Sequence, residues 1–402
     1  MPDQKKVLMI LPHMTGGGAE RVAAQLMNRL NECGYDTRFL LTHAKQSEVV
    51  RTDLGEATPL LLLAETLKKE TALQKLAYLP QRVFSALCGA LFEKRGADTP
   101  AAGGKAAIVW QYHREIRFLR AYLKKEPDLT VIAFLQPAIP IALLAARGLP
   151  NRVVISERAD PNRLMKKRYG RKLIEKYYVR ADAAVFQTKD AYAVYPACVS
   201  EKGTVIPNPL KAGLPAPYHG ERNKTVTTFC RISKQKNLPL LLEAFSLLHA
   251  DRPDYTLRVI GDAPNAEGEA VLSGIKTYIG SHGLTDAVSL EPFSANVHEA
   301  VLRDAMYVNS SDYEGISNAM LEAMAIGMPA VCTDCPIGGA KQTIRDGENG
   351  LLVPVGDAAA LYRAMKRVIE EPGLSQRLSE NAVTLRETLS LEAIAERWAA
   401  LL

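Results

Sequence analysis

Short continuous apolar runs alternate along the chain with segments in which apolar residues recur every three or four positions. Residues 6–12, 37–42 and 130–135 are runs that predict buried strands, and residues 21–34 have the helical pattern. The alternation starts again near residue 226 with further pairs of strand and helix. Strand–helix alternation is typical of parallel sheets covered by helices, so we expect an α/β protein with two Rossmann-like domains.

Residues 205–225 separate the two series. This segment, VIPNPLKAGLPAPYHGERNKT, is rich in proline and lacks apolar periodicity, which predicts a linker. We place an N-terminal, acceptor-binding domain at residues 1–207 and a C-terminal domain at residues 208–402, and we expect the last helix to pack back on the N-terminal domain. Ligands bind such sheets at the carboxyl ends of the strands, which predicts a site in a cleft between the domains.

Composition is that of a soluble globular chain long enough for two domains: 402 residues, 47% hydrophobic and 23% charged. The N-terminus lacks the apolar core of a secretory signal, and the six cysteines have no framework spacing. Both observations favour a cytoplasmic location. Cys332 and Cys335 form a CxxC without a second ligand pair for zinc. We interpret this motif as a structural turn, with a redox pair as the alternative.

Two glutamates in the second domain raise the question of a binding site. Glu314 lies in a glycine-containing loop after a predicted strand, and Glu322 lies in an apolar helix whose expected N-cap is Ser317. A carboxylate among apolar neighbours is costly unless it is paired. The N–H groups at the start of a helix suit a phosphate. The region therefore predicts an anion site flanked by two carboxylates, which would accept hydrogen bonds from sugar or ribose hydroxyls.

A basic loop, FCRISKQKN at residues 229–237, follows the first strand of the second domain. Arg231 and Lys236 are therefore expected at the carboxyl end of a strand, near the same predicted cleft. A basic loop alone is commonly a solvated turn. Beside a helix N-terminus and two acids, phosphate binding is the better interpretation.

Motifs of several other classes are missing from the sequence. It contains no Asp-x-Asp and no GxxxxGK[ST] loop, and its GGGAER turn does not fit GxGxxG. GISNA lacks the second glycine of a hydrolase elbow, and no histidine follows His298 to complete that triad. Nothing indicates the interleaved aromatics of a nucleic-acid binder. These gaps argue against a P-loop NTPase, a dehydrogenase, a serine hydrolase and a nucleic-acid-binding protein.

Residues 314–322, EGISNAMLE, resemble the E-x7-E motif of the family 4 glycosyltransferases, which have the GT-B fold of two facing Rossmann-like domains. Residues 323–357 are similar to the segment that follows this motif, and GGGAERV and RISKQKN match further blocks in the expected order. VISERADPNR and VFQTKDA resemble a subgroup that builds bacterial capsular, exopolysaccharide and lipid-linked oligosaccharides. The resemblance covers nearly the whole chain and departs from the family at Cys230, where relatives usually have glycine.

The resemblance implies roles for individual residues. Glu314 would bind hydroxyls of the donor sugar and Glu322 the ribose hydroxyls of the nucleotide. Arg231 and Lys236 would hold the diphosphate as it leaves. The other positions carried over are Gly315, Ile316, Ser317 and Asn318 at the phosphate site, Gly16 and Gly17 in the first domain, Phe293 near the base, and Glu157 and Arg158 facing the sugar. His113 fits a helix surface better than a general base.

The resemblance also implies a reaction, the transfer of a sugar from a nucleotide donor with retention at the anomeric carbon. UDP-activated hexoses or N-acetylhexosamines are the commoner donors among resembling chains, and we expect a lipid-diphosphate-linked glycan as acceptor. We expect neither a cofactor nor a divalent metal, because cations and a helix start are available for the diphosphate. A GT-B protein that binds nucleotide sugars without transfer, a sugar phosphorylase and an epimerase remain alternatives.

Basic residues are in excess in the first domain. Arg168, Lys172, Lys176 and Arg180 recur every four residues and predict one basic helix stripe. Residues 79–95 predict an amphipathic helix with a basic end. We expect peripheral binding to an anionic membrane surface on the inner face of the cytoplasmic membrane. The alternative is a core-packing helix with a solvated charged face.

Overall fold

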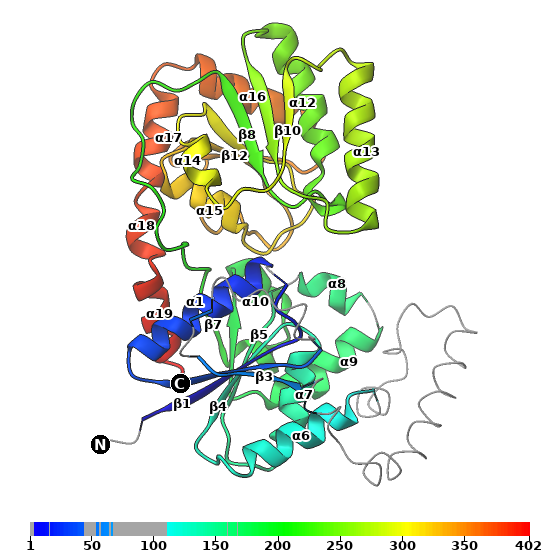
Figure 1. Ribbon diagram of the computed structural model, residues 1–402, viewed down its shortest axis with the longest axis vertical. Coiled ribbons are helices and arrows are strands. Elements are labelled where there is room, and N and C mark those ends of the chain that lie inside the picture. Colours follow the sequence, from blue (N-terminus) through cyan, green and yellow to red (C-terminus); the bar gives the residue numbers. More distant parts are fainter. Residues whose placement is uncertain are drawn as a thin grey trace, which may run out of the picture. The chain divides into compact units, whose positions relative to one another are not determined.

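The computed structural model describes residues 4–15, 17–43, 54–55, 58–63, 66, 111–158, 160–166 and 168–402. The chain divides into two units, one formed by residues 1–206 together with 395–402 and the other by residues 207–394. Each unit contains its own parallel sheet with helices packed on it (Figure 1). The predicted α/β class, with two Rossmann-like sheets, is confirmed.

The sheet of the first unit has the strand order β3-β2-β1-β4-β5-β6-β7. Its strands are β1 (Lys6–Leu11), β2 (Asp36–Leu41), β3 (Leu60–Leu62), β4 (Thr130–Phe134), β5 (Val153–Ser156), β6 (Ala183–Phe186) and β7 (Gly203–Val205). Its helices are α1 (Gly18–Glu32), α6 (His113–Leu123), α7 (Ala138–Ala145), α8 (Pro161–Met165), α9 (Arg168–Lys176), the 3₁₀ turn η3 (Tyr178–Arg180), α10 (Lys189–Val194) and α11 (Ala197–Ser200). The strand order reverses between β1 and β4, which are paired in parallel.

The sheet of the second unit has the strand order β10-β9-β8-β11-β12-β13. Its strands are β8 (Thr225–Phe229), β9 (Thr256–Ile260), β10 (Val288–Glu291), β11 (Met306–Asn309), β12 (Ala330–Thr333) and β13 (Leu351–Val353). Its helices are η4 (Lys234–Lys236), α12 (Leu238–Asp251), α13 (Ala266–Ser281), α14 (Val297–Val301), α15 (Asn318–Ala325), α16 (Ala358–Glu370), α17 (Leu374–Ala382) and α18 (Leu385–Thr388). In this unit α12 packs on α13 and α16, whereas α15 packs on β11 and β12.

The apolar runs become strands because both faces of each sheet are covered. Val7 to Leu11 of β1 are completely buried, as expected for a central strand of a parallel sheet. The helix after β1 begins at Gly18, and the chain leaves it through Gly34, whose φ of +90° favours glycine.

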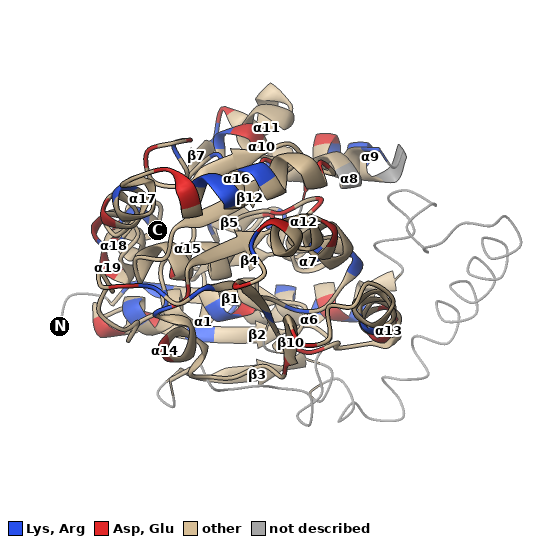
Figure 2. Cartoon of the chain, turned by 90° about the horizontal axis from the view of Figure 1, so that it is seen from above, with Lys and Arg blue, Asp and Glu red and all other residues tan. Residues whose placement is uncertain are grey.

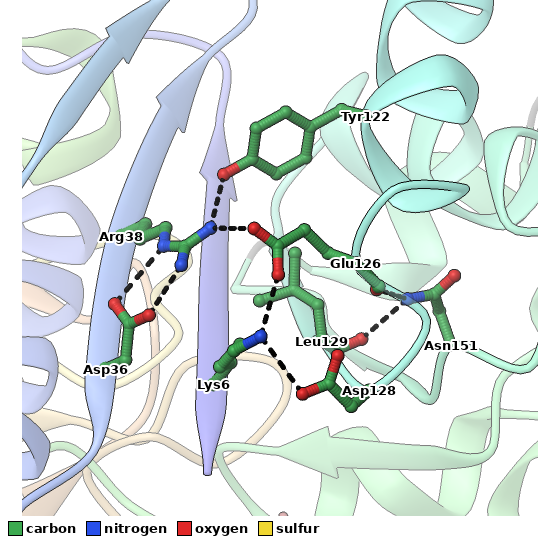
Figure 3. Close-up of polar contacts among 8 residues, drawn as sticks. All are labelled: Lys6, Asp36, Arg38, Tyr122, Glu126, Asp128, Leu129 and Asn151. Atoms are coloured by element: carbon green, nitrogen blue, oxygen red, sulfur yellow. Dashed lines mark hydrogen bonds and ion pairs between the residues drawn. The ribbon is translucent and has the colours of Figure 1, made fainter. Parts of the chain in front are cut away.

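An ion-pair network joins the amino ends of β1, β2 and β4 (Figure 3). Arg38 binds Asp36 on its own strand and Glu126 in the loop before β4, and Lys6 of β1 binds Glu126 and Asp128. Asn151 donates to the main-chain oxygens of Glu126 (2.7 Å) and Leu129 (3.0 Å). The network therefore fixes the edge of the sheet opposite to the carboxyl ends of the strands.

The segment predicted as a linker is held on the second unit by two arginines. Arg222 donates to main-chain oxygens of Tyr218, Gly327 and Asp304, and burial lowers its pKa to about 10. Arg386 donates to the main-chain oxygens of Leu214, Pro215 and Ala325. Composition predicted a spacer here, but these contacts make much of it part of the second unit.

The last helix, α19 (Leu391–Ala399), passes from the second unit into the first. Trp398 is fully buried, and its ring centroid lies 5.6 Å from that of Phe134 at the end of β4. Arg152 donates to the main-chain oxygen of Leu401 at 2.9 Å. These contacts explain why residues 395–402 belong to the first unit.

The predicted basic helix stripe is wrong in its length. Helix α9 ends at Lys176, and Arg180 belongs to the 3₁₀ turn η3. Tyr177 and Tyr178 are both buried in the core of the unit at helical spacing from Leu173 and Ile174, so the pattern of burial continues past the end of the helix. Lys172, Lys176 and Arg180 are nevertheless exposed, and basic positions are visible along α9 (Figure 2). The amphipathic helix predicted at residues 79–95 lies outside the described residues.

Candidate functional site

Two loops meet where the strand order of the second unit reverses. Strands β8 and β11 are neighbours there, and ligands of doubly wound sheets bind outside the carboxyl ends of such strands. The loops are residues 230–237 and 310–317. Besides the contact of Lys236 with Glu314, four hydrogen bonds join them: Gln235 Nε2 to Tyr313 O (2.8 Å), Asp312 N to Gln235 O (3.0 Å), Asn237 Nδ2 to Asp312 Oδ1 (2.7 Å) and Ser310 Oγ to Lys236 O (2.9 Å). The two predicted site loops therefore form one connected frame.

Lys236 and Glu314 form an ion pair inside this frame. Their side chains are only 13% and 11% exposed, and Ser311 Oγ also donates to Glu314 Oε1 at 3.3 Å. Burial lowers the pKa of Lys236, but the attraction of the Glu314 carboxylate outweighs it, so the net pKa shift is upward. Arg231 is exposed, and its charge acts on both Lys236 and Cys230. The structure thus brings together the three residues that are expected to contact the donor sugar and its diphosphate.

The start of α15 lies in the second of these loops. Ser317 is the N-cap, as predicted, and its Oγ accepts a hydrogen bond from the Met320 N–H at 3.3 Å. Asn208, from the predicted linker, is 4% exposed and donates to Asn318 Oδ1 (2.6 Å) and to the main-chain oxygen of Ile316 (3.4 Å). The linker therefore supports the proposed phosphate loop directly, a role that its composition did not reveal.

A tight main-chain contact fixes the position of Gly315. A Cβ added to Gly339 would lie 1.5 Å from the Gly315 carbonyl oxygen, so only glycine permits this approach. Two residues earlier, Ile337 has a φ of +66°, which is rare for a β-branched residue. Strained backbone of this kind is concentrated at ligand sites. The family resemblance covers residues 323–357 but assigns no role to Ile337 or Gly339.

The buried acid Glu322 has a partner that sequence reasoning missed. Its Oε2 lies 2.8 Å from Nε2 of His298 on α14, and the two side chains are 5% and 8% exposed. The His298 ring lies edge-on to Phe229, with centroids 5.7 Å apart. The pairing expected for a carboxylate in this apolar helix is therefore present. No motif links the two residues, and only the unexplained acid gave a signal.

Phe293 lies in the loop after β10 and is 67% exposed, an unusual degree for a large apolar side chain. Its main-chain N–H donates to Asp262 Oδ1 at 3.1 Å, which holds the loop next to the end of β9. An exposed aromatic ring at a strand end is available to stack on a planar ligand. The predicted contact with the base stays a prediction.

The CxxC motif is buried. Cys332 and Cys335 are free thiols, and burial raises the pKa of Cys335 to about 12 and that of Cys332 higher still. Redox chemistry requires the thiolate. The raised pKa values favour the structural interpretation of this motif.

In the first unit, Glu20 organises the glycine-rich turn. Its Oε2 accepts hydrogen bonds from the N–H groups of Thr15 (2.5 Å) and Gly17 (2.9 Å), and the residue is only 6% exposed. Gly16, also predicted to approach the donor, lies outside the described residues. The predicted role of Gly17 toward donor and acceptor stays a prediction.

Glu157 and Arg158 follow β5 but have different surroundings. Glu157 Oε2 accepts from the Tyr178 hydroxyl at 3.1 Å, and that hydroxyl accepts from Gln136 Nε2 at 2.9 Å. Arg158 is 8% exposed, with its guanidinium carbon 4.5 Å from the centroid of the Phe134 ring. Burial lowers its pKa to about 9. Arg158 therefore packs in the core of its unit, and the predicted contacts of both residues with the sugar remain untested.

Three further observations concern membrane-spanning helices, metal sites and the position of His113. Within the part of the chain that the structure describes, no helix is long and apolar enough to cross a membrane. Among the same residues, no group of three or more His, Cys, Asp or Glu side chains is placed to hold a metal ion. His113 begins α6 and is half-buried, in agreement with a helix position.

Comparison with known proteins shows what the chain is similar to in sequence and in fold. Residues 216–384 match the family model described as glycosyl transferases group 1. The chain is 32% identical over 181 residues to the lipopolysaccharide core biosynthesis glycosyltransferase LpsE of Rhizobium meliloti. The aligned part covers 44% of this chain and 49% of the relative. It is also 26% identical over 282 residues to a Campylobacter jejuni enzyme, N-acetylgalactosamine-N,N'-diacetylbacillosaminyl-diphospho-undecaprenol 4-alpha-N-acetylgalactosaminyltransferase. That alignment covers 66% of this chain and 74% of the relative.

The matches differ in how much of each relative they cover. Four curated relatives are matched over only 20%, 49%, 43% and 49% of their own lengths. Among solved structures, Anabaena Alr3699/HepE in complex with UDP and glucose has a TM-score of 0.75 and 16% identity, with 99% of both chains covered. At that identity the likeness concerns the fold, which is the predicted GT-B fold.

Proposed function

We propose that this protein is a retaining glycosyltransferase, because residues 216–384 match the family model described as glycosyl transferases group 1. It moves a hexose or N-acetylhexosamine from a UDP-sugar to a lipid-linked or polysaccharide acceptor during bacterial surface glycan synthesis. The observation that carries the proposal is the Lys236–Glu314 ion pair, with Arg231 beside it, at the point where the strand order reverses.

The charges of this site suit a departing nucleoside diphosphate. Negative charge develops on the leaving diphosphate in the transition state, and cations and N–H groups that are already oriented stabilise it best. Arg231 and Lys236 supply the cations, and the N–H groups at the start of α15 supply hydrogen-bond donors. Because Glu314 holds Lys236 in place, the ammonium group needs little reorganisation when the donor binds.

The two glutamates have separate tasks in this proposal. Glu314 accepts hydrogen bonds from hydroxyls of the donor sugar, and Glu322 accepts them from the ribose. We assign neither of them the role of a covalent nucleophile. Transfer then takes place on the face from which the diphosphate leaves, and the leaving phosphate takes the proton of the acceptor hydroxyl.

The choice of donor and acceptor is supported by the relatives. Alr3699/HepE has been solved with UDP and glucose, and the Campylobacter relative is named for a substrate linked to diphospho-undecaprenol. A lipid-linked acceptor would bring the protein to the membrane. The exposed Lys172, Lys176 and Arg180 of the first unit would attract an anionic surface.

A donor panel tests the proposal. UDP-, GDP- and ADP-sugars are incubated with the protein, and release of the nucleoside diphosphate is measured with and without a polyprenyl-diphosphate-linked glycan. We expect release to depend on one donor class and to rise when the acceptor is added. A donor that binds without acceptor-dependent turnover would favour a binding protein, and release of a sugar phosphate would favour a phosphorylase. Either result would overturn the proposed reaction.

A further inference from the structure

His298 and Glu322 form a buried pair, and the proposed reaction gives a task to Glu322 but none to His298. His298 Nε2 lies 2.8 Å from Glu322 Oε2, and both side chains are almost fully buried. We propose that His298 is a positioning residue, which orients the Glu322 carboxylate so that it recognises the ribose hydroxyls of the nucleotide. This inference rests on the proposed function, because it concerns the nucleotide part of the donor.

The His298 ring is itself held by the strands of the site. It lies edge-on to Phe229 at the end of β8, with an interplanar angle of 83°. Phe229 in turn packs on Tyr307 of β11, with ring centroids 5.0 Å apart. Strands β8 and β11 are those between which the strand order reverses. The orientation of the Glu322 carboxylate is therefore coupled, through two rings, to the same edge of the sheet that positions Lys236.

The hydrogen bond from His298 takes up only part of the acceptor capacity of the carboxylate, which has about four lone-pair positions. Two adjacent ribose hydroxyls need two of these positions. A free glutamate would sample several rotamers and would lose entropy when it bound a ribose. The bond from His298 restricts Glu322 before the nucleotide arrives, and this raises the affinity for a ribose over a deoxyribose.

Stability alone does not explain the pair. Replacing a buried charged pair by apolar residues of similar volume is often neutral or stabilising. Helix α15 is otherwise apolar at this point, with Leu321 and Ala323 fully or almost fully buried beside Glu322. A chain selected only for packing would have no need of an acid here, nor of an imidazole to accompany it.

The test compares ribose recognition in variants of His298. Binding of UDP and of its 2′-deoxy and 3′-deoxy analogues is measured by calorimetry, with GDP and ADP series in parallel. For the wild type we expect the deoxy analogues to bind about tenfold more weakly or worse, the effect of losing a hydrogen bond to a charged group. In His298→Leu the ratio of the Kd of a deoxy analogue to the Kd of UDP should fall towards one. In His298→Gln, which keeps an N–H donor, much of the preference for ribose should return.

His282→Leu is the matched control, because this histidine lies in the same unit but is exposed and stacks on Tyr278. It should leave the ratio unchanged. If His298→Leu weakens UDP and its deoxy analogues equally, the role of His298 is only structural and the inference is wrong. If the leucine variant does not fold, the glutamine variant tests the inference in its place. A ratio of one in folded His298→Gln would contradict the role of the N–H donor.

The outcomes also separate the two proposals. If the wild type binds a nucleoside diphosphate but does not distinguish ribose from deoxyribose, the inference about His298 fails and the proposed function survives. If the wild type binds none of the three nucleoside diphosphates, the proposed function fails, and the inference fails with it.

Discussion

Lys236→Met removes the buried cation from the site while keeping a side chain of similar length. With the ammonium about 4 Å from the departing phosphate and an effective dielectric constant of about 20, the lost attraction is roughly 4 kcal/mol. Removal of one preorganised donor in other enzymes costs about 2.7–4 kcal/mol. Both estimates predict that kcat falls by about 100- to 1,000-fold.

The same substitution also affects stability, and this effect has to be separated from the first. It leaves the Glu314 carboxylate, which is 11% exposed, without its cation. Loss of one partner of a fully buried pair costs about 3–5 kcal/mol. Because Ser311 still donates to Glu314 and the pair is partly exposed, we expect roughly 2 kcal/mol, which corresponds to a Tm lower by about 4–8 °C.

The assay is donor turnover under saturating donor, with thermal melting of every variant. Lys236→Met/Glu314→Gln should recover most of the melting temperature, because no unpaired charge remains, but none of the lost rate. Lys234→Met is the matched control, because Lys234 is exposed on the same 3₁₀ turn, and its kcat should stay near the wild-type value. Wild-type kcat in Lys236→Met, or a rate that recovers together with stability in the double variant, would refute the role of Lys236 as a diphosphate ligand.

Four further predictions follow from other parts of the molecule. Glu126→Gln should lower the free energy of unfolding by on the order of 1 kcal/mol at neutral pH. Hydrogen bonds from Lys6 and Arg38 hold the pKa of Glu126 below 4.5 in the folded protein. The difference in the free energy of unfolding between Glu126→Gln and the wild type should therefore persist above that pH and disappear as the pH falls through the lowered folded pKa. A difference that is unchanged at low pH would contradict the network. Asn208→Ala should weaken UDP binding about tenfold through loss of its hydrogen bonds to the phosphate loop, measured by calorimetry, and unchanged affinity would show that the linker does not support this loop. EDTA should leave the transfer rate unchanged, whereas loss of activity restored by magnesium or manganese would show that the cations of the site do not suffice. In liposome flotation, binding should need anionic lipid and weaken with salt. It should also fall when Arg82, Phe84 and Leu87 of the helix predicted at residues 79–95 are replaced, or when Lys172 and Lys176 become glutamine. Equal recovery with neutral vesicles would contradict a basic membrane-binding surface.

The sequence predicted the parts of the site that depend on local signals. Ser317 was recognisable as an N-cap because a serine preceded an apolar helical pattern, and it does cap α15. Lys236 and Glu314 could be placed near each other because each lies just past the carboxyl end of a strand. Parallel sheets bring such ends to one edge, so the prediction needed only the strand positions.

The parts that escaped prediction depend on contacts between distant segments. His298 and Glu322 lie on different helices, 24 residues apart in sequence, and their pairing is decided by the packing of α14 and α15. Gly339 is constrained by a carbonyl oxygen of another loop, which no local pattern reveals. Asn208 was hidden within a proline-rich stretch whose composition predicts a spacer whatever its side chains contact.

The length of the basic helix was mispredicted for a related reason. A four-residue repeat of charged residues continues from Arg168 to Arg180, but periodicity does not say where the chain must turn. Leu173, Ile174, Tyr177 and Tyr178 are buried at helical spacing, so neither the apolar nor the basic pattern marks the change to a 3₁₀ turn after Lys176.

We propose that this chain transfers a sugar through the site around Lys236 and Glu314. The decisive measurement is mass spectrometry of a diphospho-undecaprenol-linked glycan that has been incubated with the protein and a UDP-sugar. With the wild type we expect a product heavier by one hexose or N-acetylhexosamine residue, and with folded Lys236→Met at most a trace of it. An unmodified glycan with every nucleotide sugar, or equal product from the wild type and Lys236→Met, would show that this site does not transfer a sugar.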